Sequence, residues 1–205
     1  MLHLEPFISE EGVEIYKTVV GPIDNNVYVI RCSDVGESIL IDAANEPQLL
    51  LGIADELKVN TIVETHGHWD HIGAVEQLRN AGYSVGVSID DATMLPSYDY
   101  LIDDEAELTV GNLTIKAIKT PGHTPGSTCF SIVGHNILFS GDTLFPGGPG
   151  ATHFEGGDFA AIVNSIETRL FSKFPSQTIV LPGHGVHTTI GMESPKLSEW
   201  IDRGW

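Results

Sequence analysis

The ten residues ETHGHWDHIG, at positions 64–73, crowd three histidines and an aspartate into a very short stretch. Imidazole and carboxylate groups are ordinary ligands of zinc and similar divalent metals. His66 and His68 alternate by two, so on an extended segment their side chains project to the same side. Asp70 and His71 follow where we expect the chain to turn into a helix, which aims them differently. One stretch can therefore serve two neighbouring metal ions, but it supplies too few ligands for both.

Further ligand-type residues stand in three contexts of one kind. In each, a glycine precedes the ligand-type residue at or just past the end of a strand-like run: Pro121-Gly122-His123, Ser140-Gly141-Asp142 and Pro182-Gly183-His184. Glycine at that position lets the backbone turn sharply and approach closely. These motifs are too far apart for a local zinc finger and fit loops gathered at one edge of a folded sheet, where ligand sites usually lie. A one-metal site or a chance cluster would explain the first stretch alone, but five of the nine histidines fall in these motifs.

Three further residues are candidates for the wall of a substrate pocket. Trp69 stands between ligand-type residues, His153 lies in a glycine-rich loop, and His187 comes three positions after His184. Trp69 would either form part of the pocket or serve only in packing. His153 and His187 would either approach a substrate or lie on the surface, as a single histidine in a loop usually does.

The ligand motifs must be positioned by alternating strands and helices. We expect a helix to be capped by Asn45 and to continue to about residue 57, and a second to run from about Asp70 to Asn80. Asp158 is expected to cap a third helix after the glycine-rich loop 146–157, and a short fourth spans about 193–201. Segment 90–107 is acidic and is expected to be irregular, with at most a short helix. Strand-like runs are expected at 13–20, 25–32, 38–42, 60–64, 83–87, 107–110, 113–118, 127–133, 136–139 and 177–181.

This order of elements predicts an α/β fold with helices outside and strands within. Two similar halves, each a mixed sheet with helices on one side, would pack sheet against sheet. No linker rich in Pro, Gly or Ser separates the halves, so we expect residues 1–205 to form a single domain.

Charge and hydropathy exclude several classes of partner. The formal net charge of −18 at pH 7 and the lack of a basic stripe argue against a nucleic-acid partner, and favour high solubility. No run of 18 or more apolar residues indicates a transmembrane helix, so no membrane partner is expected. The first residues lack the basic start and apolar core of a secretory signal, and a cytoplasmic location is therefore expected.

The motifs together resemble those of the metallo-β-lactamase superfamily. The resemblance rests on SILIDA, THGHWDHIGA, TPGHTPGS, FSGDTLF and LPGHG, in that order, and covers nearly the whole chain. Within the superfamily the chain is most similar to hydroxyacylglutathione hydrolase, or glyoxalase II. The signs are His68, the loop at 146–157 followed by an amphipathic helix, and the ending GHGVHTTIGME.

This resemblance implies a four-layer αββα sandwich of two mixed β-sheets and a site for two divalent metal ions. Zinc is the expected metal, with iron and manganese as alternatives. Asp42 matches an acid that supports the metal loops without binding metal. By matching motif positions, the first metal would be held by His66, His68 and His123, the second by Asp70, His71 and His184, with Asp142 bridging both.

The chain departs from full-length glyoxalase II near its end. That enzyme carries an added helical domain whose basic side chains grip glutathione, whereas few residues follow His184 here. The chain instead looks like the short, single-domain bacterial type. Met192 stands where many short relatives have a basic residue, and Val186 where many have proline. The resemblance therefore leaves the thiol carrier open.

The implied reaction is hydrolysis of a thioester such as a hydroxyacyl-thiol. Two cations roughly 3.5–4 Å apart share a solvent molecule and lower its pKa to about 7, which yields a bridging hydroxide. That hydroxide would attack the carbonyl, with Asp70 and Asp142 as the catalytic carboxylates and Asp70 or solvent taking the proton. Alternatives are a lactone or β-lactam hydrolase with the same centre, and a persulfide dioxygenase with one iron. In each case the partner is a small molecule, and the sequence does not indicate an oligomeric state.

Overall fold

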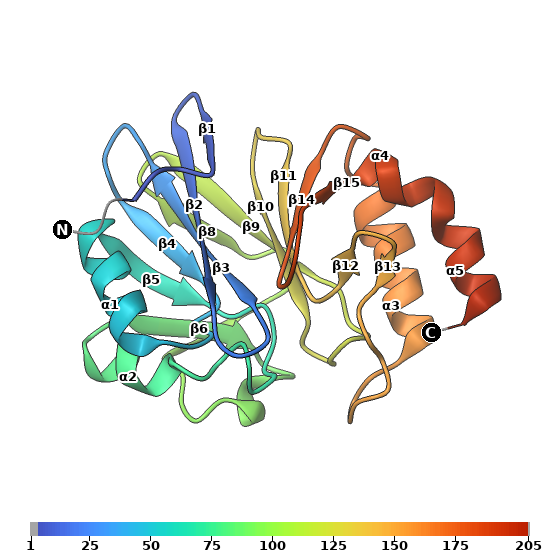
Figure 1. Ribbon diagram of the computed structural model, residues 1–205, viewed down its shortest axis with the longest axis horizontal. Helices are drawn as coiled ribbons and strands as arrows, with labels where there is room; N and C mark the ends of the chain where they lie inside the picture. The colour runs from blue at the N-terminus through green and yellow to red at the C-terminus, as the bar shows by residue number, and fades with distance from the viewer. Residues whose placement is uncertain (1–3, 205) are drawn as a thin grey trace.

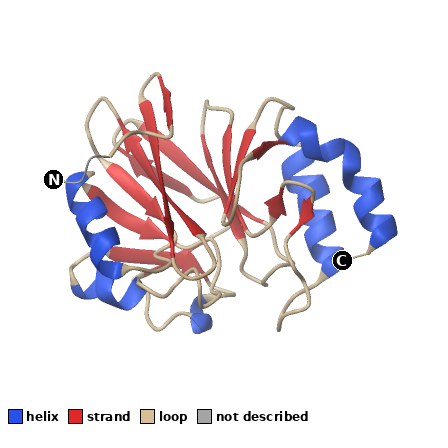
Figure 2. Cartoon of the chain, in the orientation of Figure 1, coloured by secondary structure: helices blue, strands red, loops and turns tan. Residues whose placement is uncertain are grey.

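The computed structural model describes residues 4–204 and contains two β-sheets packed face to face with helices outside them (Figures 1 and 2). The first sheet runs in chain order, with antiparallel neighbours from β1 to β4 and parallel neighbours from β4 to β7. Its strands are β1 (Ile8–Glu10), β2 (Val13–Val20), β3 (Asn25–Cys32), β4 (Ser38–Ile41), β5 (Val59–Val63), β6 (Ser84–Ser88) and β7 (Tyr100–Ile102).

The second sheet has the order β15-β14-β11-β10-β9-β8, in which only β11 and β14 are parallel neighbours. Its strands are β8 (Glu107–Val110), β9 (Leu113–Lys119), β10 (Thr128–Ile132), β11 (Ile137–Gly141), β14 (Ile179–Pro182) and β15 (Thr188–Thr189). A separate two-stranded ribbon joins β12 (Leu144–Phe145) to β13 (Gly148–Pro149).

The helices form the two outer layers. The first sheet is covered by α1 (Pro47–Glu56) and α2 (Val75–Asn80). On the side of the second sheet lie α3 (Phe159–Ser165), its π-helical continuation η2 (Ile166–Phe171), α4 (Ile190–Glu193) and α5 (Leu197–Arg203), with a short 3₁₀ turn at η3 (Ser194–Lys196). A further 3₁₀ turn, η1 (Ala92–Met94), lies between β6 and β7 of the first sheet. The Asp158 carboxylate accepts a hydrogen bond from Ala161 N at 2.9 Å, which confirms the predicted cap of α3.

Three separate apolar clusters fill the spaces between these four layers. One lies between the first sheet and α1 and α2, and includes Leu40, Leu50 and Leu78. The second lies between the two sheets, where Ile30 and Phe130 are fully buried. The third packs the second sheet against the C-terminal helices, with Ile162, Leu170 and Trp200 among its members. The predicted αββα sandwich is thereby confirmed.

The second predicted helix begins later than expected. α2 starts at Val75, not at Asp70, so Asp70 and His71 lie in turns before it. The backbone N–H groups before Val75 do not form the hydrogen bonds of an α-helix. His71 N donates to His68 O, and Ala74 N donates to Ala43 O in a neighbouring loop, both at 2.9 Å. A bond to another loop replaces the intrahelical bond of Ala74, which explains the late start.

Other boundaries were also wrong. The segment 90–107, expected to be irregular, contains strand β7, which is only three residues long and too short to read from its pattern. The expected helix at 193–201 is divided into α4, η3 and α5 around Pro195, which has no N–H to continue an α-helix. Asn45 does not cap α1, because Glu46 takes that position with a φ of 53° and no side-chain cap.

The described helices lack the length and apolar character of a membrane-spanning helix. Within residues 4–204, every helix is too short or too polar to cross a bilayer. Residues 1–3 and 205 lie outside the described range, and the single domain expected for 1–205 stays a prediction.

Candidate metal centre

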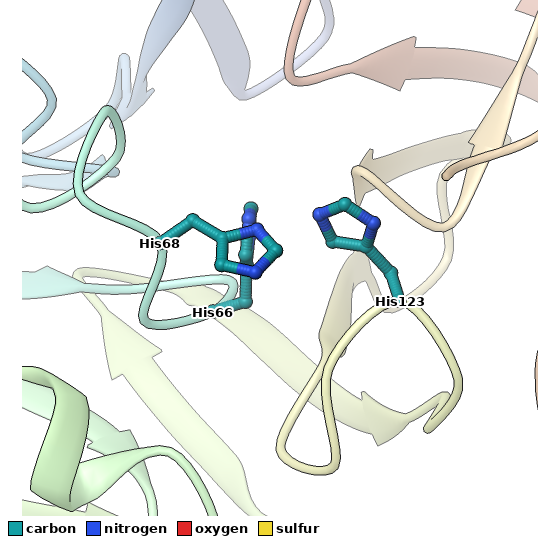
Figure 3. A group of neighbouring side chains, drawn as sticks. All are labelled: His66, His68 and His123. Atoms are coloured by element: carbon teal, nitrogen blue, oxygen red, sulfur yellow. The ribbon is translucent and has the colours of Figure 1, made fainter. Parts of the chain in front are cut away.

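Both sheets contribute side chains to one cluster at their common edge. Strands β4, β5 and β6 are parallel, so their carboxyl ends and the loops that follow them meet at this edge. Figure 3 shows His123 facing His66 and His68 from the opposite loop. Three overlapping groups have potential ligand atoms within 4.8 Å of one another: His66, His68 and His123; His66, His71 and Asp142; and Asp70, His71 and His184. The structure therefore brings together all seven side chains expected to bind metal.

The histidines are oriented by bonds to their Nδ1 atoms. Each of four rings places Nδ1 beside a fixed oxygen, which leaves Nε2 as the atom directed to the cluster. The pairs are His66 with Thr65 Oγ1 at 3.0 Å, His71 with Asp42 Oδ2 at 2.9 Å, His123 with the Ala151 carbonyl at 2.6 Å, and His184 with the Ile23 carbonyl at 3.0 Å. Such bonds fix both the tautomer and the direction of an imidazole ligand.

Several polar atoms at the centre of the cluster have no hydrogen-bond partner. They are His66 Nε2, His123 Nε2 and Asp142 Oδ1, all of them buried. A buried acceptor without a partner costs about 1–3 kcal/mol, so native structures rarely leave several together without a role. Lone pairs of nitrogen and carboxylate oxygen that converge on one space are the donor set of a divalent cation. The residues present therefore fit a metal site.

Burial keeps one set of histidines in the neutral form that binds metal. The pKa values of His66, His68 and His123 all lie below the usual range of histidine. The main cause is desolvation by burial, and for His66 and His68 the neighbouring imidazoles add to it. A neutral imidazole keeps the lone pair that a metal ion requires.

The other half of the cluster is an array of imidazoles and carboxylates. Burial alone would lower the pKa of His71, but the carboxylates of Asp142 and Asp42 raise it well above its usual range. In the same way the pKa of His184 is raised against burial by Asp70 and Asp142. Burial would raise the pKa of Asp70, but its bond with His184 and the charge of His71 lower it. The lowered pKa values of Asp70 and Asp142 favour the ionised form of both carboxyls.

Asp42 supports the centre as the sequence predicted. Its carboxylate accepts from Thr65 N at 2.7 Å and Thr65 Oγ1 at 2.9 Å, besides its bond to His71. Its backbone has a φ of 65°, a left-handed conformation that aspartate adopts more readily than most residues. Glu64, which the sequence did not single out, is fully buried and accepts from Ala43 N. Burial, followed by the Asp42 charge, raises the pKa of Glu64 well above its usual range.

Asn25 and Asn26 anchor the opposite loop, and no sequence signal marked them. Asn25 Nδ2 donates to Asp70 Oδ2 at 2.8 Å, and Asn26 N donates to the Gly183 carbonyl at 2.7 Å. These bonds join the start of β3 to the turn that carries His184. An Asn-Asn pair at a strand start has no spacing that distinguishes it from an ordinary turn.

Asp91 was also missed, and it joins the two loops that carry His66, His68 and His123. It is fully buried, and its carboxylate accepts from Gly67 N at 2.9 Å, Gly126 N at 2.7 Å and Thr124 Oγ1 at 2.6 Å. Gly67 lies between His66 and His68, whereas Thr124 follows His123. One carboxylate therefore fixes the spacing between the histidines of the first group.

Two of the predicted glycines are explained by close approaches within the centre. Gly141 has a φ of 47°, and a Cβ there would lie 2.6 Å from Thr65 Cβ. A Cβ on Gly183 would collide with Asp142 Oδ1 and lie 2.7 Å from His71 Cε1. Larger residues would therefore push apart the loops that carry the ligand-type side chains.

A cavity of about 540 Å³ opens over the cluster, and a second hollow of about 360 Å³ adjoins it. We call these the Trp69 lobe, lined by Ile23, Trp69, Met94, Phe154 and Glu155 beside the cluster, and the glycine lobe, lined by residues 145–151. Trp69 is 64% exposed and lines the first lobe.

The other two pocket candidates do not line either lobe. The ring of His153 lies 4.2 Å from that of Phe154, and the ring of His187 lies 5.7 Å from that of Phe7, edge to face. His153 therefore reaches the cavity only through Phe154, and His187 packs on the N-terminal segment.

The chain matches the family model described as "Metallo-beta-lactamase superfamily" over residues 20–184. It is 33% identical over 182 residues to "Hydroxyacylglutathione hydrolase GloC" of Haemophilus influenzae, covering 78% of this chain and 85% of that one. It is 31% identical over 192 residues to "Probable metallo-hydrolase YqgX" of Bacillus subtilis, covering 83% and 90%.

Solved structures with the same fold include the BLEG-1 B3 metallo-beta-lactamase, with a TM-score of 0.80 and 30% identity over 88% of this chain and 96% of that one. TTHA1623 in a di-iron-bound form gives a TM-score of 0.77 and 29% identity, covering 87% and 96%. ETHE1 from Myxococcus xanthus gives 0.79 and 27%, covering 90% and 84%. With this fold, the His and Asp cluster implies divalent metal ions.

Proposed function

We propose that this chain, which belongs to the metallo-β-lactamase superfamily, is a binuclear hydrolase that cleaves a thioester of the hydroxyacyl-thiol kind. Membership supports a metal-dependent hydrolase, and the two ions and the thioester are the proposal. The observation that carries it is the convergence of unpaired buried Nε2 and carboxylate atoms beneath an open cavity. The similarity to a hydroxyacylglutathione hydrolase supports the choice of substrate.

We assign the ligands as the groups of neighbouring atoms suggest. His66, His68 and His123 would hold one ion, and Asp70, His71 and His184 the other. Asp142 would bridge the two, because its oxygens lie 3.5 Å from His71 Nε2 and 3.6 Å from His123 Nε2, between the groups. Zinc is the proposed metal from its preference for imidazole and carboxylate, and the di-iron form of TTHA1623 makes iron the main alternative.

The bound ions would supply Lewis acidity, which makes hydroxide available near neutral pH and polarises a carbonyl. The chain's own residues hold the ligand side chains in position and form the wall of the cavity. Asn25 Nδ2 fixes Asp70 through Oδ2, and the low pKa of Asp70 keeps its carboxylate ionised. Trp69 forms an apolar wall beside the centre, against which an apolar part of a bound substrate would pack.

The lining of the cavity favours a leaving group that departs without a proton. Outside the proposed ligands, Glu155 is the one titratable side chain among the described residues that line the Trp69 lobe. A thiolate is a stable anion and leaves readily, whereas the amine of a β-lactam or the alkoxide of a lactone needs a proton. A site with few proton donors therefore suits a thioester best.

The test is a metal analysis followed by a substrate panel on one sample. Mass spectrometry should find two ions per chain, and assays should find turnover of acyl-thiols above that of lactones and β-lactams. If the metal-loaded protein turns over no thioester, the proposal is wrong.

The same experiment separates the alternatives. A single iron with oxygen consumption on a persulfide would establish the dioxygenase, and turnover restricted to lactones or β-lactams would establish another hydrolase. The two groups that contain Asp142 and Asp70 support two ions over one. A small-molecule substrate fits the size of the cavity. The cytoplasmic location and the lack of a nucleic-acid partner stay predictions.

A further inference from the structure

The Trp69 lobe presents an apolar surface that the interior of the protein does not cover. Trp69, Phe154 and Met94 are 64%, 51% and 37% exposed, and all three line the lobe with Ile23. Large apolar side chains gathered around a cavity mark the contact surface of an apolar ligand group. An apolar group of a ligand would therefore pack here, beside the cluster.

Apart from the proposed metal ligands, the one charged side chain among the described residues that line the two lobes is negative. Glu155 lines the Trp69 lobe, and within residues 4–204 no lysine or arginine lines either lobe. The chain has only 10 Lys and Arg against 28 Asp and Glu, so the electrostatic potential of the whole protein does not attract an anionic ligand to the lobes either. Several of those cations form ion pairs away from the cavity, among them Arg169 with Asp104 and Arg79 with Asp99.

Three cations lie near the lobes but are engaged in other contacts. Lys196 Nζ donates to Glu193 Oε2 at 3.1 Å, and the same oxygen accepts from Gly147 N at 3.0 Å. Lys17 Nζ donates to the Gly185 carbonyl at 2.9 Å and sits over the ring of Phe7. Arg203 Nη2 approaches the Gly147 carbonyl at 3.5 Å from the end of α5. None of these three side chains lines a lobe. A carrier with several carboxylates would therefore find Glu155 and no lysine or arginine along the surface it must cross.

We propose that this centre selects acyl compounds with an uncharged or cationic, largely apolar carrier, and that Glu155 disfavours thiols bearing several carboxylates, such as glutathione. This specificity rests on the proposed thioester hydrolase function, which it narrows to a substrate class. Glu155 acts as a specificity-determining residue through its charge, because like charges at the open cavity repel and salt screens that repulsion.

Binding measurements test the specificity without any need for turnover. The probes are S-hexylglutathione and its diamide, in which carboxamides of nearly the same shape replace both carboxylates. Calorimetry with the metal-loaded protein should show the diamide binding about tenfold more tightly at low salt, with the difference shrinking as salt is added. Glu155→Gln should reduce the ratio of diamide affinity to free-acid affinity. Glu155→Lys should make the free-acid probe bind more tightly than the diamide. Glu56→Gln, an exposed acid on α1 that lines neither lobe, should leave the ratio unchanged.

Two results would overturn the specificity. One is equal or tighter binding of the free-acid probe by the unaltered protein. The other is a loss of free-acid affinity in Lys17→Met, Lys196→Met or Arg203→Met, which would show that those cations recruit the carboxylates. Turnover is then measured with the lactoyl thioesters of glutathione and of its diamide. If neither ester is cleaved while the binding order holds, the hydrolase proposal fails and the specificity of the cavity stands.

Discussion

Replacing Asp91 by asparagine should weaken metal binding at the first group of histidines. The Asp91 carboxylate accepts three bonds, from Gly67 N, Gly126 N and Thr124 Oγ1. An asparagine of the same shape can place its one oxygen toward Gly67 and Thr124, but its NH₂ group then faces Gly126 N. One buried donor loses its partner, at about 1–3 kcal/mol, and the remaining bonds lose their charge, so the free energy of unfolding should fall by about 2–5 kcal/mol.

The effect on metal binding follows from the position of those bonds. Gly67 separates His66 from His68, and Thr124 adjoins His123, so a displaced loop changes the spacing of all three imidazoles. Loss of an orienting partner behind metal ligands typically lowers affinity 10–100-fold. Titration against a competing chelator, with separate constants for two ions, should show a loss of about this size at one ion and a smaller loss at the other.

The control is Asp99→Asn. Asp99 also accepts three bonds, from Arg79 Nε, Arg79 Nη2 and Val85 N, but it contacts no proposed ligand. Its replacement should lower stability and leave both metal affinities unchanged. If Asp91→Asn also keeps both affinities within about twofold, Asp91 stabilises the fold without positioning the histidines, and the reasoning is refuted.

Three further predictions concern the centre and the core. Asp142→Ala should abolish metal binding and activity together, and full activity in this variant would refute the bridging role. Metal binding should release protons, because carboxylates raise the pKa values of His71 and His184 against the effect of burial, and affinity should rise as the pH is raised through those values. Calorimetry in buffers of different ionisation enthalpy measures that release, and a release of zero would contradict the prediction. Phe130→Ala should lower the free energy of unfolding by about 3–5 kcal/mol in urea titrations, since the side chain is fully buried between the sheets. A loss below about 1 kcal/mol would contradict this prediction and show that neighbouring side chains fill the cavity left by the ring.

The layers of the fold could be predicted because the apolar pattern marks them directly. Runs such as SILI and TCFSI are buried along their whole length, and the apolar positions of α3 face inward. Helix boundaries could not be predicted where a bond from elsewhere replaces a local one. Ala74 N bonds to Ala43 O, and this delays α2 in a way that no local pattern records.

The side chains of the centre were predictable, whereas most of those that orient them were not. The Pro-Gly-His turns mark His123 and His184 without any structure, whereas Gly-His alone does not, since His135 follows Gly134 and lies outside the cluster. Asp91 and Asn25 are common residues in an acidic chain, and their roles depend on bonds to segments distant in sequence. Only the folded chain brings these partners within reach. Asp42 could be singled out because it ends a strand within a recognised motif.

The seven clustered side chains come from both sheets, four from loops of the first and three from loops of the second. A pair of bound cations would therefore act as a cross-link, much as a disulfide does between distant parts of a chain. The cross-link closes long loops, and the entropy that it removes from the unfolded chain grows slowly with their length. The amides of β5 and β14 should then become protected from hydrogen exchange together when metal is added, since neither sheet can open fully without releasing an ion.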